Sequence, residues 1–172
     1  LVRCADGQRI SGIITETEAY RGEEDLACHA RSGRTNRNAV MYGMAGRAYI
    51  YFTYGMHWCL NAVCGPSGFP AAVLLRAIHP QEGLEFIAAR RDGVQKADWC
   101  KGPARLCKAL AIDGTLNGAL LCDQDSPIFI EECFNLDDAS VTTSPRIGIQ
   151  YAPEPWRSKP WRYAADIIRG QS

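Results

Sequence analysis

The sequence predicts a single α+β domain with a largely antiparallel sheet. Strand-like runs fill the first half of the chain, helical patterns follow between residues 80 and 114, and strand-like segments return toward the end. Strands grouped apart from helices favour an antiparallel sheet with helices packed against it. The 172 residues suffice for one domain with its own core, and 47% apolar and 22% charged residues are ordinary for a globular protein.

The first strand pattern, over residues 9–20, ends in Thr15-Glu16-Thr17-Glu18-Ala19-Tyr20. Alternate side chains share one face of a strand, so Glu16, Glu18 and Tyr20 are expected to point the same way. Two neighbouring acids are costly to bury. This face is therefore either a polar strand face exposed to solvent, the commoner case, or a site in which one carboxylate is a general base. The spacing does not choose between Glu16 and Glu18.

Strands over residues 47–54 and 57–64 are predicted to form a tight hairpin, because only Gly55 and Met56 separate them. Tyr54 lies at its tip. A bulky ring exposed there is suited to entering a stack of bases.

The remaining pattern predicts a buried strand, two helices and two late strands. The strand over residues 71–78 is apolar except for Arg76, which needs an acidic partner such as Glu18 if it is buried. An early proline, early acids and a final glycine indicate the first helix. The helices are expected over residues 80–91 and from Gly102-Pro103 to Asp113-Gly114, and the late strands over residues 128–132 and 146–151.

Two polar residues each allow two interpretations. His29 is either a surface or internally bonded histidine, or one wall of a slot that holds a flat heterocycle between itself and Tyr20. Asn61 lies in an apolar strand, so its amide is expected to bond the backbone or to read the edge of a ligand.

Charge is segregated along the chain although the net charge is zero. Residues 109–145 contain seven acids and no Lys or Arg, whereas residues 26–81 contain no acid. This predicts a positive face of the kind that binds phosphates, with ordinary surface scatter as the simpler explanation. The basic residues of the acid-free stretch are Arg31, Arg34, Arg37, Arg47 and Arg76.

Eight cysteines are present without a CxxC motif or a histidine pair at ligand spacing, so we expect no metal and no cofactor. A chain of this size does not need disulfides, and mostly reduced, buried thiols are expected, as in an intracellular protein of the cytoplasm, nucleoid or nucleus. No apolar run approaches the roughly 20 residues that span a bilayer, and no signal peptide is visible, so no membrane partner is expected.

A series of spaced motifs resembles the alkyladenine (3-methyladenine) DNA glycosylase family over residues 9–151. The motifs are Gly12-Ile-Ile-Thr-Glu-Thr-Glu-Ala-Tyr20, His29, Gly33-Arg-Thr-Asn-Arg-Asn38, Met41-Tyr42, Tyr49-Ile-Tyr51, Tyr54-Gly-Met56, Asn61, Leu74-Leu-Arg-Ala77 and Gly102-Pro-Ala-Arg-Leu-Cys-Lys-Ala-Leu-Ala-Ile112. The resemblance implies one compact glycosylase domain over residues 1–172, with a curved sheet, a protruding hairpin and packed helices. The family usually has a helical segment before the first strand, and in this sequence, which begins at Leu1 rather than Met, that segment is either absent or trimmed.

The resemblance also implies a monofunctional, monomeric enzyme that hydrolyses the N-glycosidic bond of damaged purines in double-stranded DNA, without a lyase step. It implies that Glu18 activates water together with Arg76 and the main chain of Ile147. It further implies that Tyr20, His29 and Tyr51 stack on the flipped base and that Asn61 screens the purine edge. Tyr54 would fill the gap left in the duplex. Contacts with the DNA backbone are expected from Arg31, Arg34, Arg37 and Arg47.

Two other functions fit parts of the pattern. One is a lesion-recognising DNA-binding protein without turnover. The other is a hydrolase of small molecules on the same scaffold, which would leave Tyr54 without a purpose.

Overall fold

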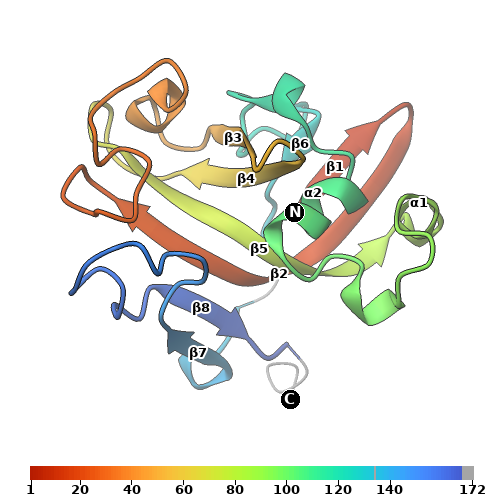
Figure 1. Cartoon of the computed structure of the whole chain (residues 1–172). Helices are drawn as coiled ribbons and strands as arrows, with labels where there is room; N and C mark the ends of the chain where they lie inside the picture. Colours follow the sequence, from red (N-terminus) through yellow and green to blue (C-terminus); the bar gives the residue numbers. More distant parts are fainter. Residues whose placement is uncertain (134, 168–172) are drawn as a thin grey trace.

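The computed structural model describes residues 1–133 and 135–167. In these residues the strands form one curled sheet with antiparallel pairing throughout (Figure 1). The order is β3-β4-β5-β2-β1-β6, and the β7–β8 hairpin joins at β2 through β8. The strands are β1 (Val2–Ala5), β2 (Gln8–Arg21), β3 (Ala48–Thr53), β4 (His57–Val63), β5 (Ala71–Glu82), β6 (Ile128–Phe129), β7 (Val141–Ser144) and β8 (Arg162–Ala165). The predicted α+β class with a curved antiparallel sheet is confirmed.

The long strands β2 and β5 run together through the middle of the sheet (Figure 1). On its other edge β2 pairs first with β1, through residues 8–11, and later with β8, through residues 16–18. The segment that carries Glu16 and Glu18 is therefore held by hydrogen-bonded strands on both edges, which fixes the direction of its side chains.

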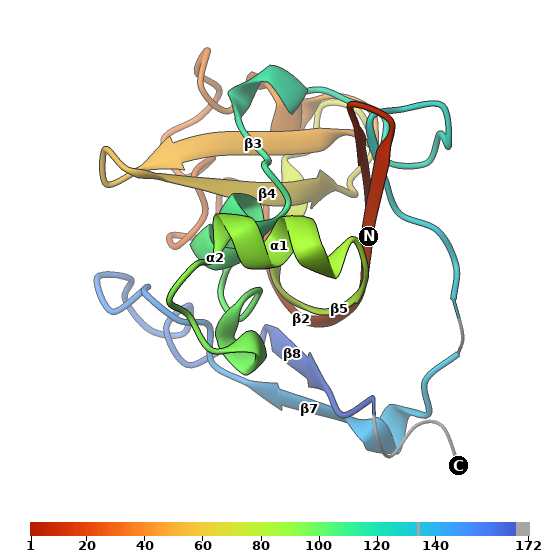
Figure 2. The same cartoon turned by 90° about the vertical axis from the view of Figure 1, so that its right-hand side faces the viewer.

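Helices α1 (Leu84–Arg90) and α2 (Pro103–Ala109) lie together against one side of the sheet (Figure 2). Ile87, Leu106 and Leu110 are fully buried there with Leu60 and Leu75 of the sheet. Short 3₁₀ segments complete the described elements: η1 (Ala39–Tyr42), η2 (Lys96–Asp98), η3 (Gly114–Leu116) and η4 (Asp138–Ser140).

A second, smaller core forms on the other face of β3. Ile50 points toward the helices, and its neighbour Tyr49 packs in a separate cluster with Cys28, Met41 and Val63. The loop between β2 and β3 thus covers this face of the sheet, and Tyr20 and Tyr51 of the predicted site pack against this cluster.

Four sequence expectations about elements were wrong in extent or type. The first helix begins at Leu84 rather than Pro80, because residues 80–82 continue β5 and pair with β2. The second helix ends at Ala109, four residues before Asp113, and Ala111 is left-handed with φ +49°. Only two residues of the segment 128–132 form a strand, and residues 146–151 form none.

Strands β1, β7 and β8 were not predicted from sequence. Each has only four residues and is stabilised by pairing with distant segments, β1 and β8 by pairing with β2 and β7 by pairing with β8. Such short segments carry too little periodicity to be recognised alone.

Candidate nucleic-acid site

Glu18 lies on β2 with no exposed surface, and three donors surround its carboxylate. The backbone N–H of Ile147 donates to Oε1 over 2.7 Å, and the Tyr20 hydroxyl donates to Oε2 over 2.8 Å. Arg76 Nη1 lies 3.2 Å from Oε1. A carboxylate has about four acceptor positions, so these three donors leave one position of the Glu18 carboxylate without a donor among the described residues.

Glu16 and Glu18 both contact Arg76, as expected for one strand face, because Arg76 Nε donates to Glu16 Oε1 over 2.7 Å. The pairing between β2 and β5 is irregular on both sides of Glu16. Glu16 pairs with Ala77 and Thr17 with Leu75, so Arg76 is an extra residue opposite β2. β-bulges of this kind redirect side chains and are common beside functional sites.

A cavity of about 580 Å³ opens next to this carboxylate. Its walls come from β2, the loop after it, β3, β4, β5 and the residues around Ile147. Glu18 lies behind this wall, and Tyr20 and Arg76, which contact it, form part of the lining. The lining residues are Tyr20, Ala27, His29, Arg31, Arg37, Met41, Tyr49, Tyr51, Thr53, Tyr54, Cys59, Asn61, Leu74, Arg76, Pro103, Ile147, Gly148, Ile149 and Tyr151.

Aromatic rings gather on one side of the cavity. The His29 ring meets Tyr51 edge to face, with 4.4 Å between centroids, and the centroids of Tyr49 and Tyr51 are 5.5 Å apart. His29 Nδ1 lies 3.0 Å from the Tyr49 hydroxyl. A flat, electron-poor ring that entered the cavity would meet these aromatic surfaces.

Two titrating groups of the cavity keep fixed protonation states near neutral pH. Removal from water, then the charges of Arg37 and Arg31, lower the pKa of His29 to about 4, so the imidazole is neutral. Because His29 remains exposed through the open cavity, solvent screens part of this effect. Burial and the neighbouring Glu18 charge raise the pKa of Tyr20, which therefore remains a donor.

Tyr54 lies in the turn between β3 and β4 and is 82% exposed. The strands are separated by three residues, 54–56, rather than by the predicted two. Tyr54 and Gly55 both have positive φ, +51° and +66°, as in the turns that match the twist of a hairpin. Figure 2 shows this turn and the loop between β7 and β8 projecting from the same side of the molecule.

Asn61 is buried, with Nδ2 donating to the Tyr49 carbonyl over 3.0 Å, and it also lines the cavity. Its side chain therefore bonds the backbone, as the first interpretation of the sequence expected, and the reading of a ligand edge by Asn61 stays a prediction.

The four predicted backbone-binding arginines do not lie together. Arg31 and Arg37 line the cavity, against the rings of Tyr151 and Tyr51 respectively. Arg34 lies over the ring of Tyr42 and outside the lining. Arg47 precedes β3 at the end opposite Tyr54, where its Nη1 donates to the Gly118 carbonyl.

Sequence reasoning missed two buried charged residues, Asp25 and Arg146. Arg146 directly precedes Ile147, and its guanidinium lies 4.5 Å from the centroid of the Tyr20 ring. One signal was available: Arg146 is the only charged residue between positions 139 and 153. The isolation of Arg146 among uncharged residues did not identify its partner Asp25, which lies 121 residues away in the sequence.

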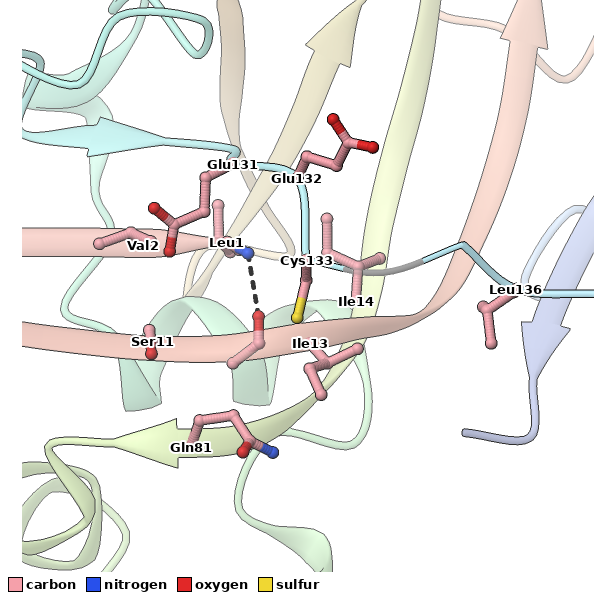
Figure 3. A pocket seen from close by; sticks show the side chains of 11 residues that line it. Leu1, Val2, Ser11, Ile13, Ile14, Gln81, Glu131, Glu132, Cys133 and Leu136 are labelled. Atoms are coloured by element: carbon pink, nitrogen blue, oxygen red, sulfur yellow. Dashed lines mark hydrogen bonds between the residues drawn. The ribbon is translucent and has the colours of Figure 1, made fainter. Parts of the chain in front are cut away.

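A second cavity, of about 270 Å³, lies between β1, β2, Gln81 of β5, residues 131–133 and Leu136 (Figure 3). Among its described lining residues none is aromatic, and none belongs to the predicted site. It therefore lacks the stacking surfaces and the shielded carboxylate of the first cavity.

Within the described residues, no group of three or more His, Cys, Asp or Glu side chains is placed to hold a metal ion. All eight cysteines are free thiols; four are buried, one is partly buried and three are exposed, so the expectation of mostly buried thiols was only half right. No helix in the described parts of the chain is both long and apolar enough to cross a membrane.

Comparisons with known proteins match nearly the whole chain. The Methylpurine-DNA glycosylase (MPG) family matches residues 1–167. The chain is 48% identical to a protein of Granulibacter bethesdensis over 85% of its own length and 69% of the relative's. It is 43% identical to a protein of Desulfitobacterium hafniense, over 95% of its own length and 83% of the relative's. It is 44% identical to a protein of Anaeromyxobacter dehalogenans, over 100% of its own length and 74% of the relative's. The names of all three assign them provisionally as 3-methyladenine DNA glycosylases.

Proposed function

The chain belongs to the methylpurine-DNA glycosylase family, and we propose that it removes damaged purines from duplex DNA by base flipping and hydrolysis at Glu18. This is a family of monofunctional N-glycosylases that act on alkylated purines in base excision repair. The substrate class is therefore damaged DNA.

One observation carries the mechanism: a fully buried carboxylate is contacted by three residues that line an aromatic cavity, and it keeps one acceptor position without a donor among the described residues. Water held by Glu18 gives its oxygen to C1′ of the deoxyribose and one proton to Glu18. The C1′–N bond breaks, and its electron pair leaves with the purine. The sugar is cation-like in the transition state, so an ionised Glu18 also stabilises it electrostatically.

Arg76 and the main chain of Ile147 are proposed to hold Glu18 and the water together. Both contact Glu18 Oε1 and line the cavity, so they reach the carboxylate and the space of the reacting atoms at once. Their positions would pre-organise the attack, which is a large part of what an enzyme contributes.

The aromatic residues of the cavity are proposed to receive the flipped base. Tyr20, His29 and Tyr51 supply stacking surface, and a neutral His29 avoids repelling a purine that alkylation has made cationic. Asn61 is proposed to screen the purine edge. Flipping costs a few kcal/mol, and Tyr54, inserted into the vacated stack, would offset part of that cost.

Arg31 and Arg37 at the cavity are the favoured phosphate contacts of the flipped nucleotide. Contacts from Arg34 and Arg47 require DNA to extend beyond the cavity and remain predictions. We further propose that the protein acts as a monomer inside the cell, in the compartment that contains the DNA.

The test is release of the base from duplexes carrying one hypoxanthine or one 1,N6-ethenoadenine, and from methylated duplex DNA. Glu18→Gln should lower the single-turnover rate constant by about 10²-fold or more, because the amide cannot accept the proton of the water. Binding to the lesion duplex should persist. Glu85→Gln, an exposed acid on α1, is the matched control and should keep the wild-type rate.

Each outcome decides between the alternatives. Undiminished release by a folded Glu18→Gln variant would refute the assigned base. Lesion binding by the wild-type protein without release from any of the three DNAs would favour the binding protein without turnover.

A further inference from the structure

Glu16, the second carboxylate of β2, has two arginine partners. Its Oε1 accepts from Arg76 Nε over 2.7 Å and from Arg162 Nε over 2.5 Å. The exposed fractions of the three side chains are 13% for Glu16, 10% for Arg76 and 27% for Arg162. Ion pairs this well shielded from solvent hold their geometry better than exposed ones.

Arg76 thereby joins the two carboxylates. Its Nε is bonded to Glu16, and its Nη1 lies 3.2 Å from Glu18 Oε1. A guanidinium is planar with donors in fixed directions, so two contacts at different nitrogens fix both its position and the orientation of its plane. Without Glu16, Arg76 would keep only the longer contact to Glu18 and could rotate about its side-chain bonds.

Arg162 is itself anchored on two strands. In β8 it pairs with Glu18 of β2 and with Ser144 of β7, and its Nη1 donates to Ser144 Oγ over 2.9 Å. Burial alone would raise the pKa of Glu16, but the hydrogen bonds of Arg162 and Arg76 lower it. Glu16 therefore stays ionised at neutral pH and remains an acceptor for both arginines.

We propose that Glu16 and Arg162 form a positioning pair that orients Arg76 toward Glu18 and its water. The β7–β8 hairpin would thus contribute to the rate of base release. Neither Glu16 nor Arg162 lines the cavity, so the pair should act on the chemical step and not on DNA binding. This inference rests on the proposed function of Glu18 and Arg76.

The experiment compares the single-turnover rate constant with the dissociation constant, using the duplexes carrying hypoxanthine or ethenoadenine. Glu16→Gln and Arg162→Ala should each lower the rate constant by about 10- to 100-fold, as expected for a misplaced catalytic contact, and change the dissociation constant by less than about threefold. Arg162→Lys should recover part of the rate, because an ammonium group can still donate to Glu16. Arg157→Ala, which breaks the exposed pair between Arg157 and Glu154, is the control.

A double variant separates orientation from charge balance. Glu16→Gln with Arg162→Gln, measured beside each of these two single variants, restores the net charge of the cluster without restoring its geometry. A positioning pair predicts that the double variant is no faster than the slower single variant and that the two losses do not multiply. A return to the wild-type rate would show that only charge balance matters and would overturn the proposal.

Three further results would overturn it: rates within about twofold of wild type, equal losses in rate and in binding, or fully multiplicative losses in the double variant. If Arg162→Ala does not unfold cooperatively, Glu16→Gln and Arg162→Lys decide the matter. A wild-type protein that releases no base would refute the proposed function and this inference together. Wild-type release with unaffected variants would refute the inference alone.

Discussion

Arg146 and Asp25 form a bidentate ion pair with no exposed side-chain surface. Nη1 lies 2.6 Å from Oδ2 and Nη2 lies 2.9 Å from Oδ1. Arg146 also donates to the carbonyls of Ala19 and Trp156. The pair connects β2, the loop after it and the segment of Ile147, which are three of the parts that form the walls of the cavity.

Removal of Asp25 should destabilise the protein strongly. Asp25→Ala leaves a buried guanidinium without its counter-charge, which costs about 3–5 kcal/mol in comparable cases. The free energy of unfolding from urea titration measures this loss. Glu154→Gln, which breaks an exposed pair, is the control and should leave the stability nearly unchanged. A loss for Asp25→Ala as small as that of the control would contradict the structural role of the pair.

Tyr54→Gly should keep the stability of the protein and lower the rate of base release. Tyr54 has φ +51°, which glycine adopts without the roughly 1 kcal/mol cost of a side chain, so the hairpin should be at least as stable as in wild type. Loss of the ring removes stacking in the duplex, typically about 1–3 kcal/mol per base, and should slow base release about tenfold or more. Tyr54→Phe retains the ring and should stay near the wild-type rate. Equal activity in the Gly and Phe variants would eliminate Tyr54 as the wedge.

The pH dependence of stability should carry a contribution from His29. Its pKa falls from the ordinary value of 6.5 to about 4 in the folded protein. Between these values the unfolded chain binds more protons than the folded one, so the contribution is present above pH 6.5 and is lost as the pH falls toward 4. His29→Gln should therefore lose less stability than wild type between pH 7 and pH 5. Denaturant titrations at the two pH values test this, and identical losses in both proteins would contradict it.

Salt should weaken DNA binding through the arginines at the cavity. If Arg31 contacts a phosphate, Arg31→Ala should lower affinity for lesion and undamaged duplexes alike and reduce the slope of log K against log salt by about one. Lys96→Ala removes an exposed charge from η2, outside the cavity lining, and should leave the slope unchanged. Equal slopes for wild type and Arg31→Ala would remove Arg31 from the phosphate contacts.

Local pattern was sufficient for several of these features. Alternation predicted that Glu16, Glu18 and Tyr20 share a face, and the structure has Arg76 in contact with both acids and the Tyr20 hydroxyl on Glu18. Strand propensity and a short break predicted the hairpin with Tyr54 at its tip. These features depend on neighbours in sequence or on one strand, and local periodicity reports such relations well.

Periodicity did not distinguish the two acids, the family resemblance assigned the base role to Glu18, and the tertiary structure gives the two carboxylates different partners. Glu16 and Glu18 have the same side chain and lie on one strand, but Glu18 receives Ile147 from 129 residues away, whereas Glu16 receives Arg162 from 146 residues away. The same long-range pairing made a loop of residues 146–151, where the sequence favoured a strand, and placed Arg146 on Asp25. The sequence by itself determined which chemical groups are present and which face of a strand they share. Burial and the distant donors that reach each carboxylate depend on how separate segments pack, and no local pattern contains that information.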